Sequence, residues 1–313
     1  MPGTGAAREP ADIVNPMPPT TVDELSAELR EHAYLPDRGL ATVLHLSLVL
    51  EKPLLLEGEA GVGKTELAKV LAAITGGRLI RLQCYEGIDV AHALYDWSYT
   101  RQLLYIRTLE AAQAVGGKER LHELFGREFL ERRPLLDAIE TDDPNPPVLL
   151  IDEIDRADDE FEAFLLELLS DFQVTIPEIG TIRAERRPAV ILTSNRTREL
   201  HDALKRRCLY LWIGHPSLER EIEIVRVRVP GVPERLAAEA AAFVQRLRQL
   251  DLAKTPGVAE TIDWTQALLA LGQQELDAGV VDATLGSVLK YHEDVERVRD
   301  AGLRELVGEA RNG

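Results

Sequence analysis

The sequence predicts an α/β fold in which a parallel five-stranded sheet lies between helices, followed by an all-helical lid domain. The first observation is a series of short apolar or alternating runs, each long enough for one strand and separated by segments with helical spacing of apolar residues. These runs are Leu54–Leu56, Arg78–Gln83, Val148–Ile151, Ala189–Thr193 and Leu209–Ile213. The second observation is a glycine-rich turn after the first run. The third is a shift at Pro216, after which the patterns are helical.

The glycine-rich turn reads GEAGVGKT from Gly58 to Thr65 and matches the phosphate-binding pattern G-x-x-x-x-G-K-[ST]. Backbone N–H groups of such a loop curl around a phosphate, and the following helix N-terminus adds a favourable dipole. We expect Lys64 to reach the β- and γ-phosphates and the Thr65 hydroxyl to hold Mg²⁺. A chance lysine after a glycine turn is the competing interpretation. The apolar run before the turn and the helical spacing of Leu67, Val70 and Leu71 after it favour a nucleoside triphosphate site.

Length and composition bound the domain organisation. A chain of 313 residues can hold two domains. We expect a nucleotide-binding α/β domain over residues 21–215 and a helical lid domain over residues 216–313. Residues 1–20 are rich in Pro, Gly, Ala and Thr, which predicts disorder.

The charge balance bears on partners and location. The 53 acidic residues against 36 basic ones give a net charge of −17, which disfavours a nucleic acid or an anionic membrane surface as a partner. A local basic patch stays compatible with that sum. No stretch is long and apolar enough to span a bilayer, so we expect no membrane insertion. Cys84 and Cys208 follow no metal-ligand spacing, and so sparse a cysteine content indicates a reducing, cytoplasmic setting.

Polar side chains follow two of the later runs. Asp152 and Glu153 come directly after Val148–Ile151, and Asn195 follows Ala189–Thr193. Ligands of parallel α/β sheets bind at the carboxyl ends of the strands, so we expect Asp152 beside Mg²⁺ and Glu153 as general base for the attacking water. Asn195 can orient that water. Alone, acidic residues would start a helix and an asparagine would form a turn; with the loop, they predict hydrolysis.

Two further features each leave two interpretations open. The basic trio Lys205, Arg206 and Arg207 is either a solvated helix C-terminus or the source of an arginine that stabilises transition-state charge on a neighbouring subunit's nucleotide. The aromatic residues of the irregular segment 86–107 either pack a loop or hairpin onto the body or contact a substrate or partner. They are Tyr95, Trp97, Tyr99 and Tyr105.

The remaining segments predict helices, apart from one hairpin over Phe172–Arg187. In the first part of the chain the expected helices cover Val22–His32, Gly39–Leu50, Leu109–Val115, Lys118–Ile139, Asp159–Asp171 and His201–Arg207. After Pro216 they cover Leu218–Val227, Glu234–Gln249, Ile262–Leu276 and Ala283–Asp300.

The ordered set GEAGVGKT, LLIDEIDR, TSN and ALKRRC resembles the AAA+ P-loop NTPases. The QVTIPEIG hairpin and the aromatic insert resemble the MoxR branch. YEGIDVAHALYDW together with KRRCLYLWI is most similar to MoxR-type ATPases associated with molybdenum-containing carbon monoxide dehydrogenases. The resemblance runs from about Leu35 to about Leu289.

This resemblance implies roles for particular residues. The Walker A loop would bind ATP through Gly58, Glu59, Ala60, Gly61, Val62, Gly63, Lys64, Thr65 and Glu66. Asp152 and Glu153 would be Walker B, with Thr65 and Asp152 on Mg²⁺, and Asn195 would be sensor 1. Arg207 would be the arginine finger, with Arg206 as runner-up. Many relatives carry a sensor 2 arginine in the lid, but here Glu260 and Thr261 stand in its place, so sensor 2 is unassigned.

The resemblance also implies an assembly and a task. Members form homo-oligomeric rings, usually hexamers, and act as chaperone-like maturation factors, often with a partner that carries a von Willebrand factor A domain. The expected function is therefore a ring-forming ATPase that remodels a protein client, such as a molybdenum hydroxylase. The alternative is a non-hydrolytic, nucleotide-dependent assembly switch or scaffold.

Overall fold

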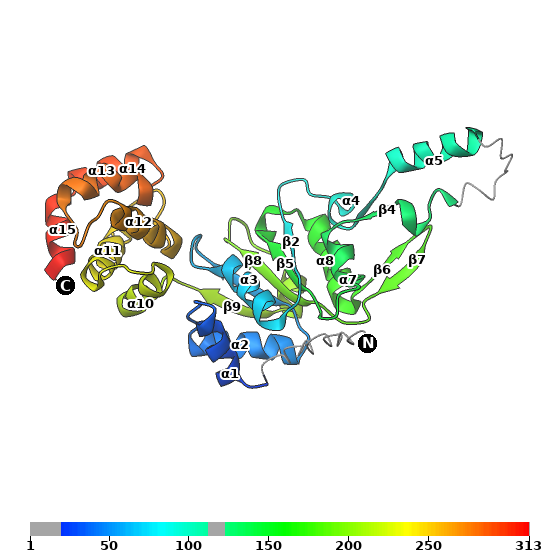
Figure 1. Cartoon of the computed structure of the whole chain (residues 1–313), viewed down its shortest axis with the longest axis horizontal. Helices are drawn as coiled ribbons and strands as arrows, with labels where there is room; N and C mark the ends of the chain where they lie inside the picture. The colour runs from blue at the N-terminus through cyan, green and yellow to red at the C-terminus, as the bar shows by residue number, and fades with distance from the viewer. Residues whose placement is uncertain (1–19, 112–122, 313) are drawn as a thin grey trace, which may run out of the picture.

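The computed structural model describes residues 20–111 and 123–312, and its central element is a parallel sheet (Figure 1). The strand order is β2-β5-β8-β1-β9. Leu54 lies opposite Ile191 of β8 and Leu209 of β9, so the strands end at one common edge. The five strands are β1 (Leu54–Gly58), β2 (Leu79–Gln83), β5 (Val148–Asp152), β8 (Ala189–Ser194) and β9 (Leu209–Ile213). The predicted parallel five-stranded sheet is confirmed.

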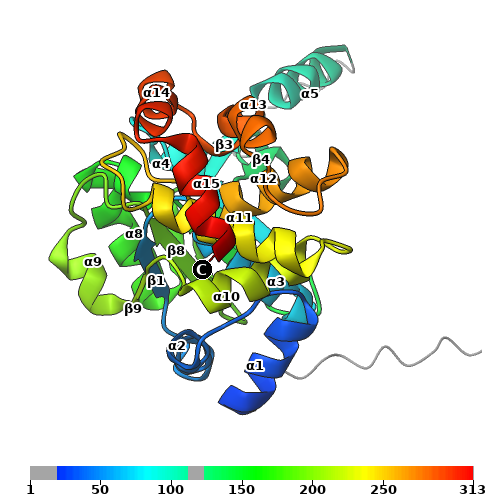
Figure 2. The same ribbon diagram turned by 90° about the vertical axis from the view of Figure 1, so that its left-hand side faces the viewer.

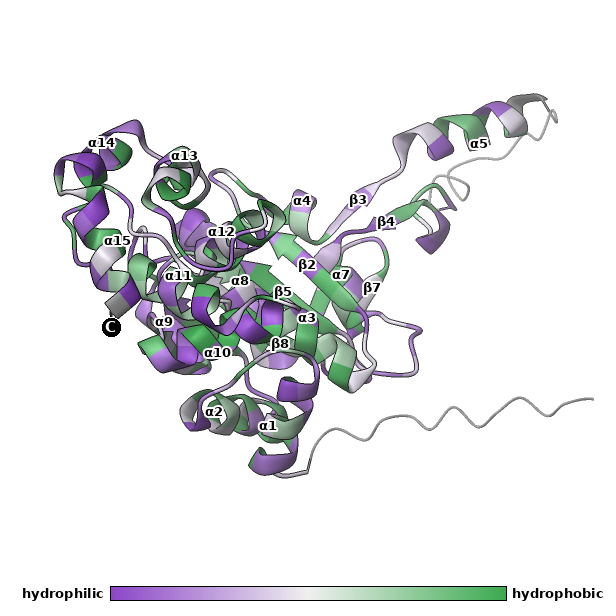
Figure 3. Cartoon of the chain, turned by 60° about the vertical axis from the view of Figure 1, so that its left-hand side comes forward, coloured by the Kyte–Doolittle hydropathy of each residue, from purple (hydrophilic) through white to green (hydrophobic). Residues whose placement is uncertain are grey.

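Both faces of the sheet are covered because successive side chains of a strand point to opposite faces. Leu54 and Leu56 pack on one face with α1 (Val22–Glu31), α2 (Arg38–Val49) and α3 (Lys64–Thr75). Leu55 packs on the other face. The helices of that face are α4 (Val90–Ala93), α7 (Pro134–Ile139), α8 (Asp159–Asp171) and α9 (Asp202–Arg207). Figure 3 shows apolar strands between helices whose outer turns are hydrophilic. The middle strands therefore read as continuous apolar runs.

A smaller unit is inserted between β2 and β5. The strands β3 (Tyr95–Trp97) and β4 (Leu130–Arg132) pair antiparallel and carry α5 (Tyr99–Ala111), which projects from the end of the molecule opposite to the C-terminal helices (Figure 1). The predicted helix over Lys118–Ile139 is wrong in its described part, residues 123–139, and its first residues lie outside the described chain. Its described part forms a 3₁₀ turn (Arg127–Phe129), then β4, and only then α7. Pro134 explains this outcome, because proline disfavours helix in the preceding residue and fits the first turn of α7.

The aromatic residues of this insert divide between the two interpretations. Trp97 packs edge-on against Tyr95 and Phe125, with ring centroids 6.1 and 5.3 Å away, which is the packing role. Tyr99 is 69% exposed, and the neighbouring Leu103 and Leu104 of α5 are more than half exposed. Part of the predicted helix Leu109–Val115 and nearly all of the expected disordered segment 1–20 lie outside the described residues.

The predicted hairpin is confirmed as β6 (Gln173–Ile176) and β7 (Gly180–Arg183), which pair antiparallel directly after α8. Between β5 and α8 a 3₁₀ turn covers Ile154–Arg156. No helix in the described part of the chain is long and apolar enough to cross a bilayer.

The residues after β9 form six helices, which we call the C-terminal helical region (residues 218–312). They are α10 (Leu218–Arg228), α11 (Glu234–Leu247), α12 (Val258–Ala270), α13 (Ala278–Val288), α14 (His292–Asp300) and α15 (Leu303–Asn312). The expected helix over Ile262–Leu276 instead begins at Val258, after the extended Gly257, and stops before Gly272, whose φ is +74°. The expected single helix over Ala283–Asp300 is wrong, because the backbone turns extended at Leu289 and Tyr291. α15 was not predicted.

This region has its own apolar core and a buried ion pair. The rings of Phe243 and Trp264 pack at 5.3 Å between centroids. Beside them, Arg248 Nη1 lies 2.6 Å from Glu221 Oε2, and neither side chain is more than 9% exposed. The Thr261 hydroxyl also donates to Glu221 at 2.7 Å. The pair joins α10, α11 and α12, and Figure 2 shows these helices in front of the sheet.

We expect Arg248→Met to lower the free energy of unfolding by about 3–5 kcal/mol, because it leaves the buried Glu221 carboxylate without its counter-charge. The matched control is Arg246→Met, which removes the more exposed pair with Glu309 and should cost less than about 1 kcal/mol. Urea unfolding of both variants gives the comparison. Equal losses would show that the Glu221–Arg248 pair has no special structural role.

Candidate nucleotide-binding site

The phosphate-binding loop, residues 58–65, connects β1 to α3 at the carboxyl edge of the sheet. A Cβ at Gly58 would lie 2.0 Å from the carbonyl oxygen of Ile213, so only glycine lets β9 approach this closely. Gly63 has φ +95° and precedes the first residue of α3. The loop therefore places backbone N–H groups next to a helix N-terminus, the arrangement that binds phosphate anions.

Lys64 is held within the loop. Its Nζ donates to the carbonyl oxygens of Gly58 and Glu59, both at 2.7 Å. Burial lowers the pKa of Lys64 from its ordinary value, and the Asp155 and Glu59 carboxylates oppose that shift. The ammonium group thus lies inside the loop, where its charge can stabilise an incoming phosphate.

The Asp152 carboxylate collects donors from three elements. Thr65 Oγ1 of α3 lies 3.1 Å from Asp152 Oδ1, and the Thr193 hydroxyl of β8 donates to the same oxygen at 2.5 Å. Arg81 of β2 reaches Oδ2 with Nε at 3.0 Å and Nη2 at 2.5 Å. Asp152 is only 3% exposed, so these contacts compensate a buried charge.

Glu153 lies one residue further, with its carboxylate held from two sides. Gln83 Nε2 donates to Oε2 at 3.0 Å and Asn195 Nδ2 donates to Oε1 at 3.3 Å. Its backbone has φ +54°, which is uncommon for a residue with a side chain. The Thr193 hydroxyl fixes that backbone by accepting from the Glu153 N–H at 2.9 Å. Glu153 is half-buried, so its carboxylate can reach a water in the site.

The loop after β8 is anchored by Asp155. The buried Asp155 carboxylate accepts from the Asn195 N–H at 3.2 Å and from the Thr197 N–H at 2.8 Å. These contacts set the backbone of Asn195 and leave its side-chain amide directed at Glu153.

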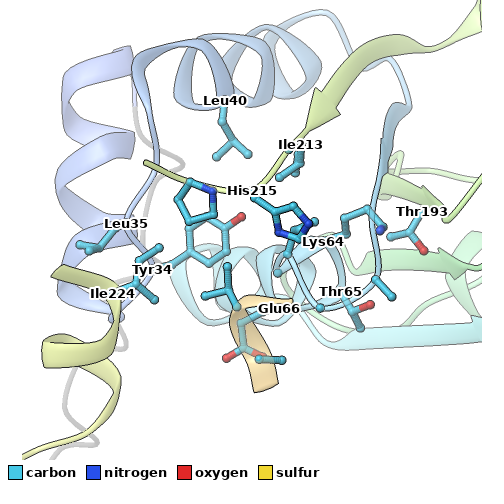
Figure 4. A pocket seen from close by; sticks show the side chains of 18 of the residues that line it. Tyr34, Leu35, Leu40, Lys64, Thr65, Glu66, Thr193, Ile213, His215 and Ile224 are labelled. Carbon is cyan, nitrogen blue, oxygen red and sulfur yellow. The ribbon is translucent and has the colours of Figure 1, made fainter. Parts of the chain in front are cut away.

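A pocket of about 690 Å³ joins the loop to the C-terminal helical region. One side is polar, with Lys64, Thr65, Asp152, Glu153 and Asn195. The opposite side is formed by apolar and aromatic side chains, several of which Figure 4 labels: Tyr34, Leu35, Leu40, Ile213 and Ile224. Apolar walls with a few convergent polar groups are typical of small-molecule sites, and this volume suits one nucleotide.

His215, from the connection between β9 and α10, points into the same pocket (Figure 4). Its Nδ1 is buried and has no hydrogen-bond partner among the described residues. Burial, together with the nearby Arg248 charge, lowers the pKa of His215, which favours the neutral form of this ring.

The structure brings most of the predicted site residues together. Residues 60–66, Asp152, Glu153 and Asn195 line the pocket, and Arg228 Nη1 is 2.9 Å from Glu66 Oε1. Gly58 and Glu59 do not line it; their carbonyl oxygens accept from Lys64. Arg206 and Arg207 are the exception. They occupy the exposed last turn of α9, do not line this pocket, and form no ion pair with the described residues.

Sequence reasoning missed the supporting residues. Arg81 and Gln83 belong to β2, which ends at the same edge of the sheet as β5. The rule that parallel strands end together would have placed Gln83 near Glu153. Thr193 and Asp155 had no comparable signal. A threonine within a strand, here β8, and an aspartate that follows a strand, here β5, serve many structural purposes.

The donor set fits a magnesium ion that is bound together with nucleotide. Thr65 and Asp152 offer a hydroxyl and carboxylate oxygens at 3.1 Å from each other, and Mg²⁺ prefers such oxygens with phosphates and water completing its coordination. Within the described residues no group of three or more His, Cys, Asp or Glu side chains could hold a metal.

Comparison with known proteins adds the following findings. A point mutant of RuvB from Thermotoga maritima superposes with a TM-score of 0.48 at 17% identity, covering 89% of this chain and 76% of that one. A second RuvB structure, the Thermotoga maritima Holliday junction branch migration motor, gives 0.43 at 17% identity and covers 86% and 72%. NtrX from Brucella abortus in complex with ATP gives 0.42 at 15%; it covers 75% of this chain and 51% of NtrX.

No curated protein matches the sequence. The family comparison is more direct, because residues 53–208 match the AAA domain of the dynein-related subfamily. This range begins just before β1 and ends just after α9, so it includes the loop, Asp152, Glu153, Asn195 and the basic trio. With the parallel sheet and phosphate-binding loop described above, residues 53–208 are an AAA domain of the dynein-related subfamily, in an AAA+ P-loop NTPase fold.

Proposed function

We propose that this protein is an ATP hydrolase that assembles into a ring and uses ATP to remodel a client protein. The observation that carries the proposal is the position of Glu153, held by Gln83 and Asn195 at the mouth of the phosphate-binding loop. An AAA+ domain supports nucleotide-driven remodelling in general. A binding-only switch, the alternative, needs the loop but has no use for an oriented carboxylate beside it.

The proposed reaction transfers the γ-phosphoryl group to water. Lys64 and the loop N–H groups bind the phosphates, and Thr65 and Asp152 would hold Mg²⁺, which would supply positive charge beside the phosphates. Glu153 takes a proton from a water molecule while the oxygen of that water attacks the γ-phosphorus. The bond between the γ-phosphorus and the oxygen that bridges it to the β-phosphate breaks, and ADP leaves. Asn195 and Gln83 keep the Glu153 carboxylate in place for this step.

The ring is inferred from the arginines that the site of one chain does not use. Arg206 and Arg207 are exposed at the end of α9 and unpaired among the described residues. We propose that Arg207, or Arg206, reaches the nucleotide of a neighbouring subunit and stabilises charge there. The resemblance to MoxR-type ATPases supports a hexamer.

The domain bounds, the client and the location that we propose rest on the resemblance to MoxR-type ATPases. We propose residues 21–215 as the nucleotide-binding domain and 216–313 as its lid. The client would be a metalloenzyme such as a molybdenum hydroxylase, with a von Willebrand factor A domain protein as helper and a cytoplasmic location. Neither nucleic acid nor a membrane is part of the proposal.

We expect Lys64→Ala to abolish ATP binding or weaken it severely, because the buried ammonium that would contact the β- and γ-phosphates is removed. Calorimetric titration with ATP measures this. The control is Lys52→Ala, an exposed lysine before β1, which should bind as the wild type does. Tight binding by Lys64→Ala would remove the basis of the proposed function.

For Glu153→Gln we expect ATP binding to persist while hydrolysis slows by about 10²–10⁴-fold, because the amide keeps the shape of the side chain but cannot accept the proton. Steady-state phosphate release gives the rate, and Glu160→Gln, on the exposed first turn of α8, is the control. Near-normal turnover in Glu153→Gln would move the base to another residue.

The third expectation concerns Arg207 and separates a ring from a self-contained enzyme. Arg207→Ala should keep nucleotide affinity and lose about 10³–10⁵-fold in rate. Mixing Arg207→Ala with Lys64→Ala, each inactive alone, should restore part of the activity, because a mixed ring places an intact loop beside an intact arginine. If mass measurements show mixed rings and activity stays absent, Arg207 does not act across an interface.

A further inference from the structure

The amino end of α12 is in direct backbone contact with the phosphate-binding loop. The Ala259 N–H donates to the carbonyl oxygen of Gly61 at 3.0 Å. A Cβ added at Gly257 would lie 2.5 Å from the Ala60 carbonyl oxygen and 2.9 Å from the Cα of Gly61. The C-terminal helical region therefore touches the loop with no side chain between the two backbones.

Gly257 is needed for space and not for its backbone angles. Its φ of −84° and ψ of −177° suit any residue, so the restriction comes from the loop packed against it. The Glu260 carboxylate accepts a hydrogen bond from the Gly257 N–H at 2.9 Å and so fixes the Gly257 backbone next to the loop. The first turn of α12 carries this carboxylate and no basic residue, so α12 reaches the loop through its backbone and not through a cation.

The hydrogen bond to Gly61 also sets a group that could bind phosphate. The peptide unit joining Gly61 to Val62 is planar and trans, so its C=O and N–H point in opposite directions. With the Gly61 oxygen held by Ala259, the Val62 N–H must point away from α12. The position of α12 thus fixes the direction of one of the loop N–H groups.

A second contact between the C-terminal helical region and this segment lies directly after the loop. Arg228, at the end of α10, pairs with Glu66 directly after the loop at 2.9 Å. Val258, Ala259 and Ile262 of α12 line the pocket together with the loop residues. The C-terminal helical region therefore contacts the phosphate-binding loop at Gly61 and again directly after the loop, at Glu66.

We propose that the Gly257–Gly61 contact couples the C-terminal helical region to nucleotide: phosphate bound in the loop fixes the loop backbone, and the fixed loop holds α12. The inference rests on the proposed function, because it assigns the loop a bound nucleotide. Coupling is reciprocal, so docking of α12 strengthens nucleotide binding by the same factor by which nucleotide strengthens docking. Gly257 and Ala259 are positioning residues that act through the loop.

The test compares Gly257→Ala with Gly286→Ala, since a Cβ at Gly286 of α13 would meet no atom within 4 Å. Calorimetry with a non-hydrolysable ATP analogue should show about 5–150-fold weaker binding for Gly257→Ala and an unchanged affinity for Gly286→Ala. Ala259→Pro is the second variant. It removes the N–H that reaches Gly61 and puts the proline Cδ in its place, against the Gly61 carbonyl oxygen, so the contact is broken. Proline is tolerated in the first turn of a helix, so α12 itself should persist. It should weaken binding in the same range.

Hydrogen exchange supplies a readout that a purely structural role would not move. In the wild type the analogue should slow exchange of the amides over residues 257–262, and in either variant this slowing should be lost. The inference is overturned if the analogue leaves exchange of these wild-type amides unchanged, or if both variants bind within twofold of the wild type. A wild type that binds no nucleotide would instead contradict the proposed function itself.

Discussion

The buried carboxylate of Asp152 is the constraint on which the site depends. At 3% exposure it needs compensating donors, and it receives them from α3, β8 and β2. Those contacts fix the ends of three elements relative to one another. They also place Thr193, which donates to Asp152 and accepts from the Glu153 N–H, so that one hydroxyl sets both acidic residues. Magnesium bound as proposed would add its charge to the compensation that Arg81 gives.

The parts of the fold and of the site that could be predicted from the sequence are those determined by residues close together in the chain. The loop, the strand ends and α8 follow from apolar runs and from residues adjacent in the chain, and these predictions were confirmed. The helix expected over Lys118–Ile139 failed because Pro134 and the pairing of β4 with β3 outweighed apolar spacing. The roles of Gln83 and Arg81 were not predicted, because their partners Glu153 and Asp152 are about 70 residues away in the sequence and contact them only in the folded sheet.

Glu260 shows how a missing residue can be explained by its surroundings. The resemblance to AAA+ relatives predicts an arginine near this position, and an arginine side chain would need room beside the loop. Here the Gly257 and Gly61 backbones are in contact, and the Glu260 carboxylate caps the Gly257 N–H. A close backbone contact and a projecting cation are different ways to join a helical region to a phosphate loop. The sequence shows that the arginine is missing, and the structure shows the backbone contact between Gly257 and Gly61.

The distribution of cations carries the argument for a neighbour. In a chain with net charge −17, the basic residues around the pocket are largely engaged. Lys64 is bound by loop carbonyls, Arg81 by Asp152, and Arg228 by Glu66. Phosphoryl transfer concentrates charge on the γ-phosphate oxygens. Among the described residues that line the pocket, Lys64 is the cation held in the phosphate-binding loop, and Arg220 donates from Nη2 to the carbonyl oxygen of Leu35 at 2.6 Å. The exposed pair Arg206–Arg207 lies outside the pocket, where a second copy of the chain could be reached. This distribution of cations supports our proposal that another subunit completes the site.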